Sequence, residues 1–441
     1  MNILLLGSGG REHALAHKLA ASHNVHLFAA PANPGILRHA MLANINVTQH
    51  EEVVKFCIAS DIALVIIGPE ALLASGLTDT LREHGINVFG PSRAAARIES
   101  SKAFAKDFMM RHGIPTAQYR TFSDHEHKQA REYVAQHALP IVIKADGLAA
   151  GKGVTVAKNH ADALEALDAA FDGKFGKAGK SIVVEEFMYG EEASIFAISD
   201  GERFLTLAPA QDHKRIGDGD TGANTGGMGA YCPAPIITPT VLHCVEKQII
   251  EPTLRGMKAE GYPFIGCLYA GLMIDTEDNP KVVEFNARFG DPETQAVLAV
   301  LEADFAQLLY SAATGKLDTS CVTFTARGAA CCVVLAASGY PGEVRTGDEI
   351  TGIEDAERFG NGTVTVFHAG TALHNNLDGT QSLRTNGGRV LGVTAHTHTL
   401  PEAITLAYQA LKHIHFRGKT YRTDIGYKAL QRYSLNTSKA L

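Results

Sequence analysis

The side chains of Glu284, Asn286 and Arg288 form the group in this sequence that points most clearly to chemistry. They alternate with apolar residues along the run 281–288, and because side chains alternate across a strand, we expect one apolar and one polar face. A carboxylate and an amide oxygen two residues apart suit a hard cation such as Mg²⁺, and a guanidinium beside them suits a carboxylate or a phosphate. An amphipathic edge strand with solvated polar residues is the alternative, which the following Gly290-Asp-Pro-Glu293 turn disfavours.

A lysine on a strand leads into a glycine-rich loop in the segment 141–153. Lys144 is placed to contact a nucleotide phosphate, and the run Gly151-Lys152-Gly153 could close over phosphates through its backbone N–H groups. The loop is not a Walker A motif, because Gly153 follows Lys152 where that motif requires Ser or Thr. A β-hairpin with a basic, glycine-rich turn is the alternative interpretation.

Two further segments carry less specific patterns. Residues 183–188 are typical of a strand whose end could hydrogen-bond an adenine edge, with Glu191 or Glu192 in reach of ribose hydroxyls. The segment 211–229 interleaves many glycines with Asp, Asn and Thr, so a helix or a strand core there would cost backbone entropy. We expect residues 217–229 to form an active-site loop for a zwitterionic or phosphorylated ligand. A disordered surface loop is the alternative.

The N-terminal run Gly7-Ser-Gly-Gly-Arg-Glu12 follows an apolar strand, as a dinucleotide-binding fingerprint would. Two features argue against NAD, because Glu12 occupies the third glycine position and no acidic residue ends the second strand near Asn33. The loop still offers backbone N–H groups and a helix N-terminus, which attract a single phosphate. We therefore expect a sugar phosphate at this loop.

The composition limits the classes of partner. A chain of 441 residues is too long for one core, so we expect two to four domains. An apolar content of 45% and a net charge of −7 give no footprint for nucleic acid or for an acidic membrane surface. The N-terminus has neither a signal-peptide pattern nor a bilayer-spanning stretch, so we expect a cytoplasmic protein. The seven cysteines lack metal-site spacing and fit reduced thiols.

The periodicity predicts a multidomain protein of the α/β and α+β classes. Strands at 3–6, 25–29, 62–67 and 86–89 with helices at 12–21 and 72–84 predict an N-terminal open parallel α/β sheet. A central region begins near Ser101 with a helix at 102–112 and strands at 140–145 and 182–187. A third region has strands at 329–336, 363–369 and 389–395, a helix at 401–414 and a polar tail. This third region carries no obvious catalytic cluster.

Together these motifs resemble the phosphoribosylamine–glycine ligase family, also called glycinamide ribonucleotide synthetases, of the ATP-grasp superfamily. The resemblance extends over about residues 1–430 and rests on an ordered set of motifs: Gly7–His13, Val65–Glu70, Lys144–Gly153, Asp212–Arg215 with Asn224–Gly229, Glu284–Gln295, and His368–Thr371 with Thr385–Arg389. It implies an N-terminal α/β domain at 1–101, a central ATP-grasp domain at 102–318, a C-terminal mixed α/β domain at 319–430 and a tail at 431–441. It also implies a mobile lid at about 118–190, which closes on ATP.

The resemblance implies a reaction as well. ATP would phosphorylate the carboxylate of glycine, and the amine of 5-phosphoribosylamine would attack the acyl phosphate, giving glycinamide ribonucleotide, ADP and phosphate in purine biosynthesis. No protein nucleophile is required, because charge neutralisation and positioning carry the rate. Another ATP-grasp carboxylate–amine ligase is the alternative. A non-catalytic nucleotide-binding regulator is a third hypothesis, which the presence of both metal ligands and phosphate-binding cations disfavours.

Roles for individual residues follow from the same resemblance. The residues expected to act in catalysis are Lys144, Asp212 and Arg288. The residues expected to contact ATP are Lys102, Lys144, Gly151, Lys152, Gly153, Glu185, Glu186, Phe187, Met188 and Glu192. The residues expected to bind substrate are Gly9, Gly10, Arg11, Glu12, Asn33, Gly68, Pro69, Glu70, Asp212, Lys214, Arg215, Thr225, Gly226, Gly227, Arg288, Gly290 and Asp291. Glu284 and Asn286 are expected to bind Mg²⁺, with Mn²⁺ as the alternative.

Within this set, Asp212 and Arg288 suit the amino and carboxylate ends of glycine, one charge of each sign for a zwitterion. The N-terminal loops would receive phosphoribosylamine. Many members of the superfamily place an additional acidic metal ligand on the strand before the Glu-x-Asn pair, but that strand here reads Tyr269-Ala-Gly-Leu-Met273. The number of protein metal ligands is therefore open. No coiled-coil seam is present, so monomer and homodimer are both expected states.

Overall fold

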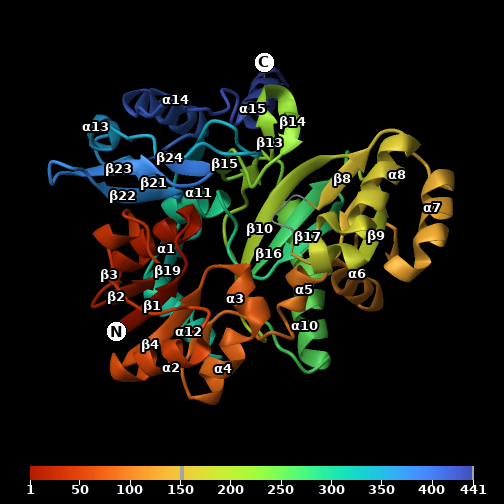
Figure 1. The fold of residues 1–441 in the computed structure, drawn as a ribbon, viewed down its shortest axis with the longest axis horizontal. Helices are drawn as coiled ribbons and strands as arrows, with labels where there is room; N and C mark the ends of the chain where they lie inside the picture. Colours follow the sequence, from red (N-terminus) through yellow and green to blue (C-terminus); the bar gives the residue numbers. More distant parts are fainter. Residues whose placement is uncertain (149–152, 440–441) are drawn as a thin grey trace.

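The N-terminal region forms the parallel sheet that its alternating strands and helices predict (Figure 1). The computed structural model describes residues 1–148 and 153–439. Its first sheet has the order β3-β2-β1-β4-β5, with every pair parallel. The elements are β1 (Asn2–Leu6), α1 (Gly10–Ala20), β2 (His26–Ala30), β3 (Met41–Leu42), α2 (His50–Ala59), β4 (Ile62–Ile67), α3 (Glu70–Ser75), α4 (Leu77–Glu83) and β5 (Val88–Phe89). Because β2, β1 and β4 are neighbours, the loops that follow them meet at one edge.

The helix expected over 72–84 is two helices, α3 and α4. Gly76 lies between them with a φ of +89°, in the left-handed region that side chains rarely adopt. The apolar pattern continues across this break, so periodicity alone did not reveal it. As a result α3 is a six-residue helix that begins at Glu70, directly after the Gly68-Pro69 turn.

The central region contains two antiparallel sheets. The first has the order β6-β9-β7-β8 and packs against α7 and α8, with which it forms a hydrophobic cluster of its own (Figure 1). Its elements are β6 (Tyr119–Ser123), α7 (His127–Gln136), β7 (Ile141–Ala145), β8 (Val154–Ala157), α8 (His160–Ala169) and β9 (Ser181–Glu186). The short helix α5 (Arg97–Ser100) and α6 (Lys102–Arg111) lead into this sheet.

The second antiparallel sheet lies between the first sheet of the central region and the N-terminal domain (Figure 1). Its order is β11-β10-β16-β17. The elements of this part are β10 (Glu191–Asp200), β11 (Phe204–Thr206), α9 (Pro239–Val245), α10 (Glu251–Ala259), β16 (Ile265–Ile274), β17 (Pro280–Asn286), α11 (Glu293–Val300) and α12 (Phe305–Ala313). A two-stranded ribbon of β18 (Glu302–Ala303) and β19 (Val322–Phe324) follows.

A third large sheet combines strands from two regions of the sequence. Its order is β12-β15-β20-β24-β21, formed by β12 (Gln211–Asp212), β15 (Gly229–Cys232), β20 (Ala329–Ala336), β21 (Val364–His368) and β24 (Arg389–Thr397). The remaining elements are β13 (Arg215–Gly217), β14 (Thr221–Asn224), α13 (Ile353–Phe359), β22 (Thr371–Asn375), β23 (Gln381–Thr385), α14 (Leu400–Ala410) and α15 (Tyr427–Lys439). Strands β12 and β15 thus join the C-terminal domain to the central region.

Two expectations for these segments differ from the structure. The glycine-rich segment 217–229 does contain strand, because β13 and β14 pair as a short ribbon whose turn includes Gly219 at a φ of +65°. Two exposed strands need little side-chain packing, so glycine is tolerated there. The polar tail expected from 431 onward continues α15, which begins at Tyr427.

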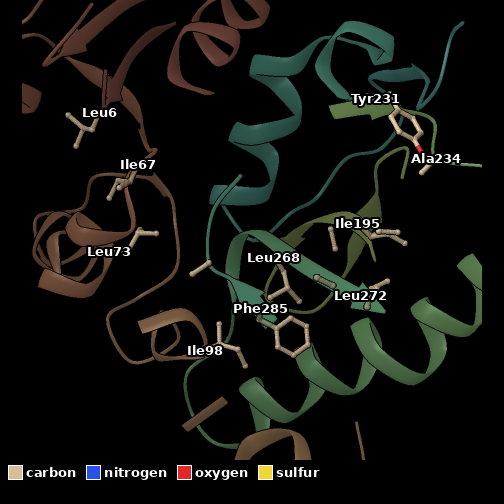
Figure 2. Close-up of a cluster of buried hydrophobic side chains, with 14 of the residues drawn as sticks. Leu6, Ile67, Leu73, Ile98, Ile195, Tyr231, Ala234, Leu268, Leu272 and Phe285 are labelled. Atoms are coloured by element: carbon tan, nitrogen blue, oxygen red, sulfur yellow. The ribbon is translucent and has the colours of Figure 1, made fainter. Parts of the chain in front are cut away.

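One large hydrophobic cluster joins the N-terminal sheet to the central and C-terminal sheets (Figure 2). It includes Leu6 and Ile67 from the N-terminal sheet, Leu268 and Phe285 from β16 and β17, and Tyr231 from β15, all nearly inaccessible to solvent. Burial of this apolar surface fixes the sheets against one another. Among the described residues, no helix is long and apolar enough to cross a membrane.

The separate cluster beneath α7 and α8 predicts local instability. Phe122 is 1% exposed within it, so we expect Phe122→Ala to cost about 3–5 kcal/mol through the cavity it leaves. In hydrogen exchange measured by mass spectrometry, amides of β6, β7 and β9 should exchange faster while those of β1 and β4 remain protected. Equal acceleration in both groups of strands would show that the cluster is not independent.

Candidate active site

The polar face predicted for β17 is present, with a local irregularity. Gly271 pairs with Glu284 and Leu272 pairs with Val282, so the strand bulges at Val283. Val282 therefore takes the core position expected for Val283. The carbonyl oxygen of Val283 accepts a hydrogen bond from Lys144 Nζ at 3.2 Å. The bulge thus draws the predicted phosphate-binding lysine to the predicted metal-binding strand.

Cations surround the Glu284 carboxylate. Burial alone would raise the pKa of Glu284, but Lys214, Lys144 and Lys102 hold it below its usual value. Glu284 is therefore ionised at neutral pH. Its neighbour Asn286 has an amide oxygen 3.4 Å from Arg288 Nη2. An ionised carboxylate and an amide oxygen on one face are donors that Mg²⁺ or Mn²⁺ accepts, so the residues present fit a divalent cation.

Lys144 and Lys106 both contact Glu185 at the end of β9. Their amines lie 2.9 and 3.1 Å from Glu185 Oε2. The other oxygen, Oε1, is buried without a hydrogen-bond partner among the described residues. An unpaired buried acceptor is costly and therefore calls for a donor. The amino group of an adenine would supply one, so this end of the cleft fits the base of ATP.

The other residues predicted for ATP make the following contacts. Lys102 Nζ donates to the Gly147 carbonyl at 2.9 Å, at the beginning of the glycine-rich loop. The side chain of Glu186 accepts a hydrogen bond from Gln118 N at 3.0 Å. The backbone at the end of β9 and the half-buried side chains of Phe187 and Met188 therefore remain for contacts with the adenine. Gly153 accepts from Ala145 N at 2.8 Å. Gly151 and Lys152 lie outside the described residues.

Glu192 and Lys214 form an ion pair across the cleft, with Lys214 Nζ 2.6 Å from Glu192 Oε2. Asp212, two residues before Lys214, is buried near them. Burial raises the pKa of Asp212 to about 8, and the carboxylates of Glu293, Glu192 and Glu284 add to the rise while Lys214 opposes it. A carboxyl group in this setting ionises when a cation binds beside it, because the cation stabilises the carboxylate form.

Arg288 is held between two carboxylates from the N-terminal side. Its Nη2 lies 2.8 Å from Glu99 Oε1, and its Nε lies 3.4 Å from Glu70 Oε2. Glu99 also accepts from Ala287 N at 2.7 Å. Glu99 was not predicted from the sequence, because a single acidic residue on the four-residue α5 carries no motif. It positions the guanidinium expected to bind glycine.

The N-terminal glycine loop is supported from beneath by Glu12. Its carboxylate accepts from Gly9 N at 2.7 Å and from Arg11 Nε at 2.6 Å. A Cβ on Gly68 would approach Glu12 Oε1 to 2.1 Å, which explains the glycine in the Gly68-Pro69 turn. Glu12 is 2% exposed, so it orders the two loops rather than presenting its carboxylate to a ligand. Arg11 Nη1 donates to the Phe289 carbonyl at 3.0 Å.

A cavity of about 390 Å³ opens above this loop, between the N- and C-terminal domains. It is lined by Ser8, Gly9, Gly10, Pro31, Ala32, Asn33, Asp291, Ala369, Gly370, Thr371, Asn386 and Arg389. The amide of Asn33 donates to the carbonyls of Ser8 and His368, both at 2.8 Å, and so ties the two domains together. The C-terminal residues were missed by sequence reasoning, although the motifs 368–371 and 385–389 contain all five of them.

Arg389 links this cavity to the Gly290-Asp-Pro turn and to the glycine-rich segment. Its Nη1 donates to the carbonyls of Asp291 at 2.7 Å and Gly226 at 2.6 Å, and its Nη2 lies 3.3 Å from Asp291 Oδ2. A Cβ on Gly227 would approach Pro292 Cδ to 2.4 Å. Thr225 accepts from Gly227 N at 2.9 Å. The predicted substrate residues 225–227 and 290–291 therefore pack together.

Arg215 lies apart from this group. Its guanidinium donates to the Gly222 carbonyl at 2.8 Å within the β13–β14 ribbon. The tip of that ribbon, 218–220, contacts the C-terminal segment. Of the glycine-rich segment expected as an active-site loop, residues 225–227 reach the turn at 290–292, whereas the ribbon tip is held by other parts of the protein.

A histidine cluster forms the wall between the domains beside this cavity. His13, His17 and His39 lie within ring-contact distance of one another or of His368 and Phe367. His13 Nδ1 accepts from His368 N at 2.8 Å. Burial lowers the pKa of His13 well below its usual value, and the neighbouring histidines lower it further. Burial and Arg38 lower the pKa of His368 to about 4.

Three family profiles match this chain in order. They describe the N domain of phosphoribosylglycinamide synthetase over residues 1–99, its ATP-grasp (A) domain over 100–294 and its C domain over 330–428. A phosphoribosylamine–glycine ligase of Mesorhizobium japonicum is 52% identical over 433 residues, which cover 98% of this chain and 99% of the relative. The crystal structure of the phosphoribosylamine–glycine ligase of Thermotoga maritima has a TM-score of 0.82 and 34% identity, covering 96% of this chain and 100% of that chain.

A more distant likeness concerns the fold alone. A biotin carboxylase–β-γ-ATP complex from Campylobacter jejuni has a TM-score of 0.68 at 14% identity, over 95% of this chain and 92% of that chain. The match of the ATP-grasp (A) domain over residues 100–294 defines an ATP-grasp ligase, a class that uses ATP with a divalent metal ion. The chain belongs to the phosphoribosylglycinamide synthetase family, whose curated relatives bear the name phosphoribosylamine–glycine ligase. The family, the ligase class and the fold class predicted from the motifs are confirmed.

The histidine cluster predicts a loss of stability in acid. In the unfolded chain a histidine titrates near pH 6.5, whereas in the folded protein the pKa of His368 is about 4 and that of His13 is lowered. The folded state therefore binds fewer protons, and its stability is full above about pH 6.5 and falls as the pH falls toward about 4. Urea unfolding between pH 7.5 and pH 4.5 measures this slope.

A variant that removes one titrating group isolates the effect. His13→Asn keeps an acceptor for His368 N and should reduce the fall in unfolding free energy between pH 6.5 and 4.5. His125→Asn is the matched control, since the His125 side chain is 94% exposed. Equal pH slopes for His13→Asn and the wild-type protein would contradict this account.

Proposed function

We propose that this chain joins glycine to 5-phosphoribosylamine, giving glycinamide ribonucleotide, ADP and phosphate in purine biosynthesis. The observation that carries the proposal is the set of four cations, Lys102, Lys144, Lys214 and Arg288, around the Glu284 carboxylate. Phosphoryl transfer to a carboxylate concentrates negative charge, and preorganised cations stabilise it. The full-length match to relatives named for this reaction supports the choice of substrates.

In this proposal ATP binds between β17 and the sheet β6-β9-β7-β8, which belongs to the lid. Lys102 and Lys144 contact its phosphates, together with the backbone of Gly151, Lys152 and Gly153. Glu185 Oε1 accepts from the adenine amino group, the strand end at Glu186, Phe187 and Met188 lines the base, and Glu192 binds the ribose. Glu284 and Asn286 hold Mg²⁺ or Mn²⁺. When bound, that cation neutralises charge between the phosphates.

Glycine lies between Asp212 and Arg288. The Asp212 carboxyl, whose pKa burial raises to about 8, ionises when the glycine ammonium arrives and pairs with it. The Arg288 guanidinium, fixed by Glu99 and Glu70, binds the carboxylate. Lys214 adds a positive charge beside the transferred phosphoryl group.

Phosphoribosylamine occupies the cavity between the N- and C-terminal domains. Its phosphate accepts from the backbone N–H of Gly10 at the N-terminus of α1, where the helix dipole favours an anion. Gly9, whose N–H donates to Glu12, lines the same cavity. Asn33, Arg11 and Glu12 order this loop, and the turn of Gly68, Pro69 and Glu70 forms the side toward glycine. Asn386 and Thr371 supply polar contacts from the C-terminal domain. Gly290, Asp291 and residues 225–227 separate this substrate from the glycine site.

The reaction then proceeds in two displacements. A carboxylate oxygen of glycine attacks the γ-phosphorus of ATP, and the bond from that phosphorus to the ADP oxygen breaks, giving glycyl phosphate. The amine nitrogen of phosphoribosylamine attacks the acyl carbon, phosphate leaves with its bonding electrons, and the nitrogen loses one proton. The cations around Glu284 stabilise charge in the first step, and the side chains at both substrate sites align the second.

The proposal includes the domain boundaries and the place in the cell where the enzyme acts. The domains are residues 1–101, 102–318 and 319–430, and residues of about 118–190 form a lid. The separate hydrophobic cluster of the lid supports its movement as a body. The enzyme acts in the cytoplasm as a monomer or a homodimer.

The direct test follows the product by mass spectrometry. ATP, Mg²⁺ and glycine are supplied with and without freshly generated phosphoribosylamine, and phosphate release is recorded in parallel. Glycinamide ribonucleotide that depends on all three substrates supports the proposal. ATP turnover without that product would move the assignment to another ATP-grasp carboxylate–amine ligase.

Loss of a charge at the reacting phosphate should reduce turnover strongly. We expect Lys144→Met and Glu284→Gln each to lower kcat by about 100-fold or more, the scale for removal of a main electrostatic stabiliser. Lys128→Met is the matched control, because Lys128 is an exposed residue of the lid helix α7. Near-normal turnover in Lys144→Met or Glu284→Gln would remove these residues from the site.

The C-terminal wall of the cavity gives a selective prediction. Asn386 lines the cavity, so Asn386→Ala should raise the KM for phosphoribosylamine on the order of tenfold through loss of a hydrogen bond to a charged group. The KM values for ATP and glycine should stay near the wild-type values. Asn375→Ala, on the β22–β23 ribbon, is the control. A change in the KM for ATP alone would assign the cavity to another ligand.

A further inference from the structure

The C-terminal segment 422–432 holds an arginine in an unusually buried position. The Arg422 side chain is 0% exposed. Its Nη1 lies 2.7 Å from Asp220 Oδ1, and its Nε lies 2.7 Å from Asp424 Oδ1. Burial alone disfavours its charge, but the hydrogen bonds that it donates to Asp424 and Asp220 raise its pKa. A buried cation is tolerated only with such partners, so Arg422 is committed to them.

The same segment binds the tip of the β13–β14 ribbon. Gly219 N donates to Asp424 Oδ2 at 2.8 Å, and Thr423 N donates to Asp218 Oδ1 at 2.8 Å. Lys428 lies 2.8 Å from Asp220 Oδ2. The acidic residues of this glycine-rich ribbon are therefore used by the C-terminal segment. This accounts for a motif that the proposed reaction does not use.

Contacts continue from the ribbon to the connection between β12 and β13, which carries Lys214. Arg422 Nη1 donates to the Arg215 carbonyl at 3.2 Å, and Gly426 N donates to His213 Nε2 at 3.3 Å. His213 and Arg215 flank Lys214 in the sequence. The His213 side chain and the Arg215 backbone, on either side of Lys214, are thus tied to the C-terminal segment.

Glu192, which forms an ion pair with Lys214, is also next to a contact of the C-terminal segment. Arg432 Nη2 lies 2.6 Å from Glu191 Oε1, at the start of β10. Glu191 directly precedes Glu192, whose Oε2 lies 2.6 Å from Lys214 Nζ. Contacts from one C-terminal segment therefore reach the residues beside both Glu192 and Lys214.

We propose that Arg422 and Arg432 are positioning residues, which hold Lys214 and Glu192 in the geometry that binds the substrates. The inference rests on the proposed function of Lys214 and Glu192. It assigns the C-terminal segment a part in substrate affinity. A segment that only stabilised the fold would change the melting temperature and leave the affinities unchanged.

The first experiment uses the partly exposed pair. Arg432→Gln, Glu191→Gln and the double variant are compared in the full chain. Arg327→Gln is the matched control, because Arg327 forms an ion pair with Glu302 at the same 2.6 Å separation. Each single variant should raise the Kd for ATP and the KM for glycine about fivefold, the upper range for a partly exposed ion pair. The double variant should equal the single variants, because all three remove one interaction.

The comparison of kcat with the Kd for ATP and the KM for glycine decides the outcome. Unchanged kcat with a raised Kd and KM supports positioning. A lower melting temperature with wild-type Kd and KM would overturn the proposal, and so would additive effects in the double variant. Calorimetric titration with ATP needs no assignment of the other substrates. If the wild-type chain binds ATP and makes no glycinamide ribonucleotide, the proposed function fails while the ATP affinities still test the positioning role.

A second pair of variants tests Arg422. Arg422→Lys keeps the charge and Arg422→Gln removes it, so the KM for glycine should rise less in the lysine variant than in the glutamine variant. Equal wild-type KM values in both folded variants would overturn the role of Arg422. If Arg422→Gln does not fold, the lysine variant and the Arg432 series decide the proposal.

Discussion

The structure depends on charge compensation in the cleft. Asp212, Glu192 and Glu284 lie close enough to influence one another's ionisation, and Lys214 opposes their repulsion. Asp212 is buried among them, and an unpaired charge there would cost several kcal/mol of desolvation. Their partners come from distant parts of the chain, so the sheets must converge for the balance to hold. The shared hydrophobic cluster supplies that convergence.

Three parts of the proposed site are also supported by a buried polar group. Glu12 accepts from the glycine loop, Glu99 pairs with Arg288, and Arg422 donates to the Arg215 carbonyl beside Lys214. Such supports limit the movement of the groups that contact substrate, and preorganisation of this kind carries much of an electrostatic rate enhancement. The lid differs, because its hydrophobic cluster is separate and its strands meet the cleft through Lys144 and Glu185. A sheet that packs independently of the rest of the site, as the sheet β6-β9-β7-β8 does, suits a site that must admit ATP and then exclude water.

The two substrate regions share one boundary. Arg389 bonds the glycine-rich segment at Gly226 to the turn at Asp291, while Asn33 connects the N-terminal loop to the C-terminal domain. These contacts join three domains around one cavity. In the proposed function, the amine held there and the carboxylate held at Arg288 would approach from opposite sides of the same turn.

The sequence by itself determined the elements and much of the residue chemistry. The apolar runs at 62–67 and 329–336 predicted β4 and β20, since periodicity is a local property. The alternation at Glu284 and Asn286 predicted a polar face because a strand dictates it. Tertiary structure alone decided the bulge at Val283, the role of Glu99 and the burial of Arg422. These depend on which distant segments meet, and single residues without a motif give no local signal of their partners.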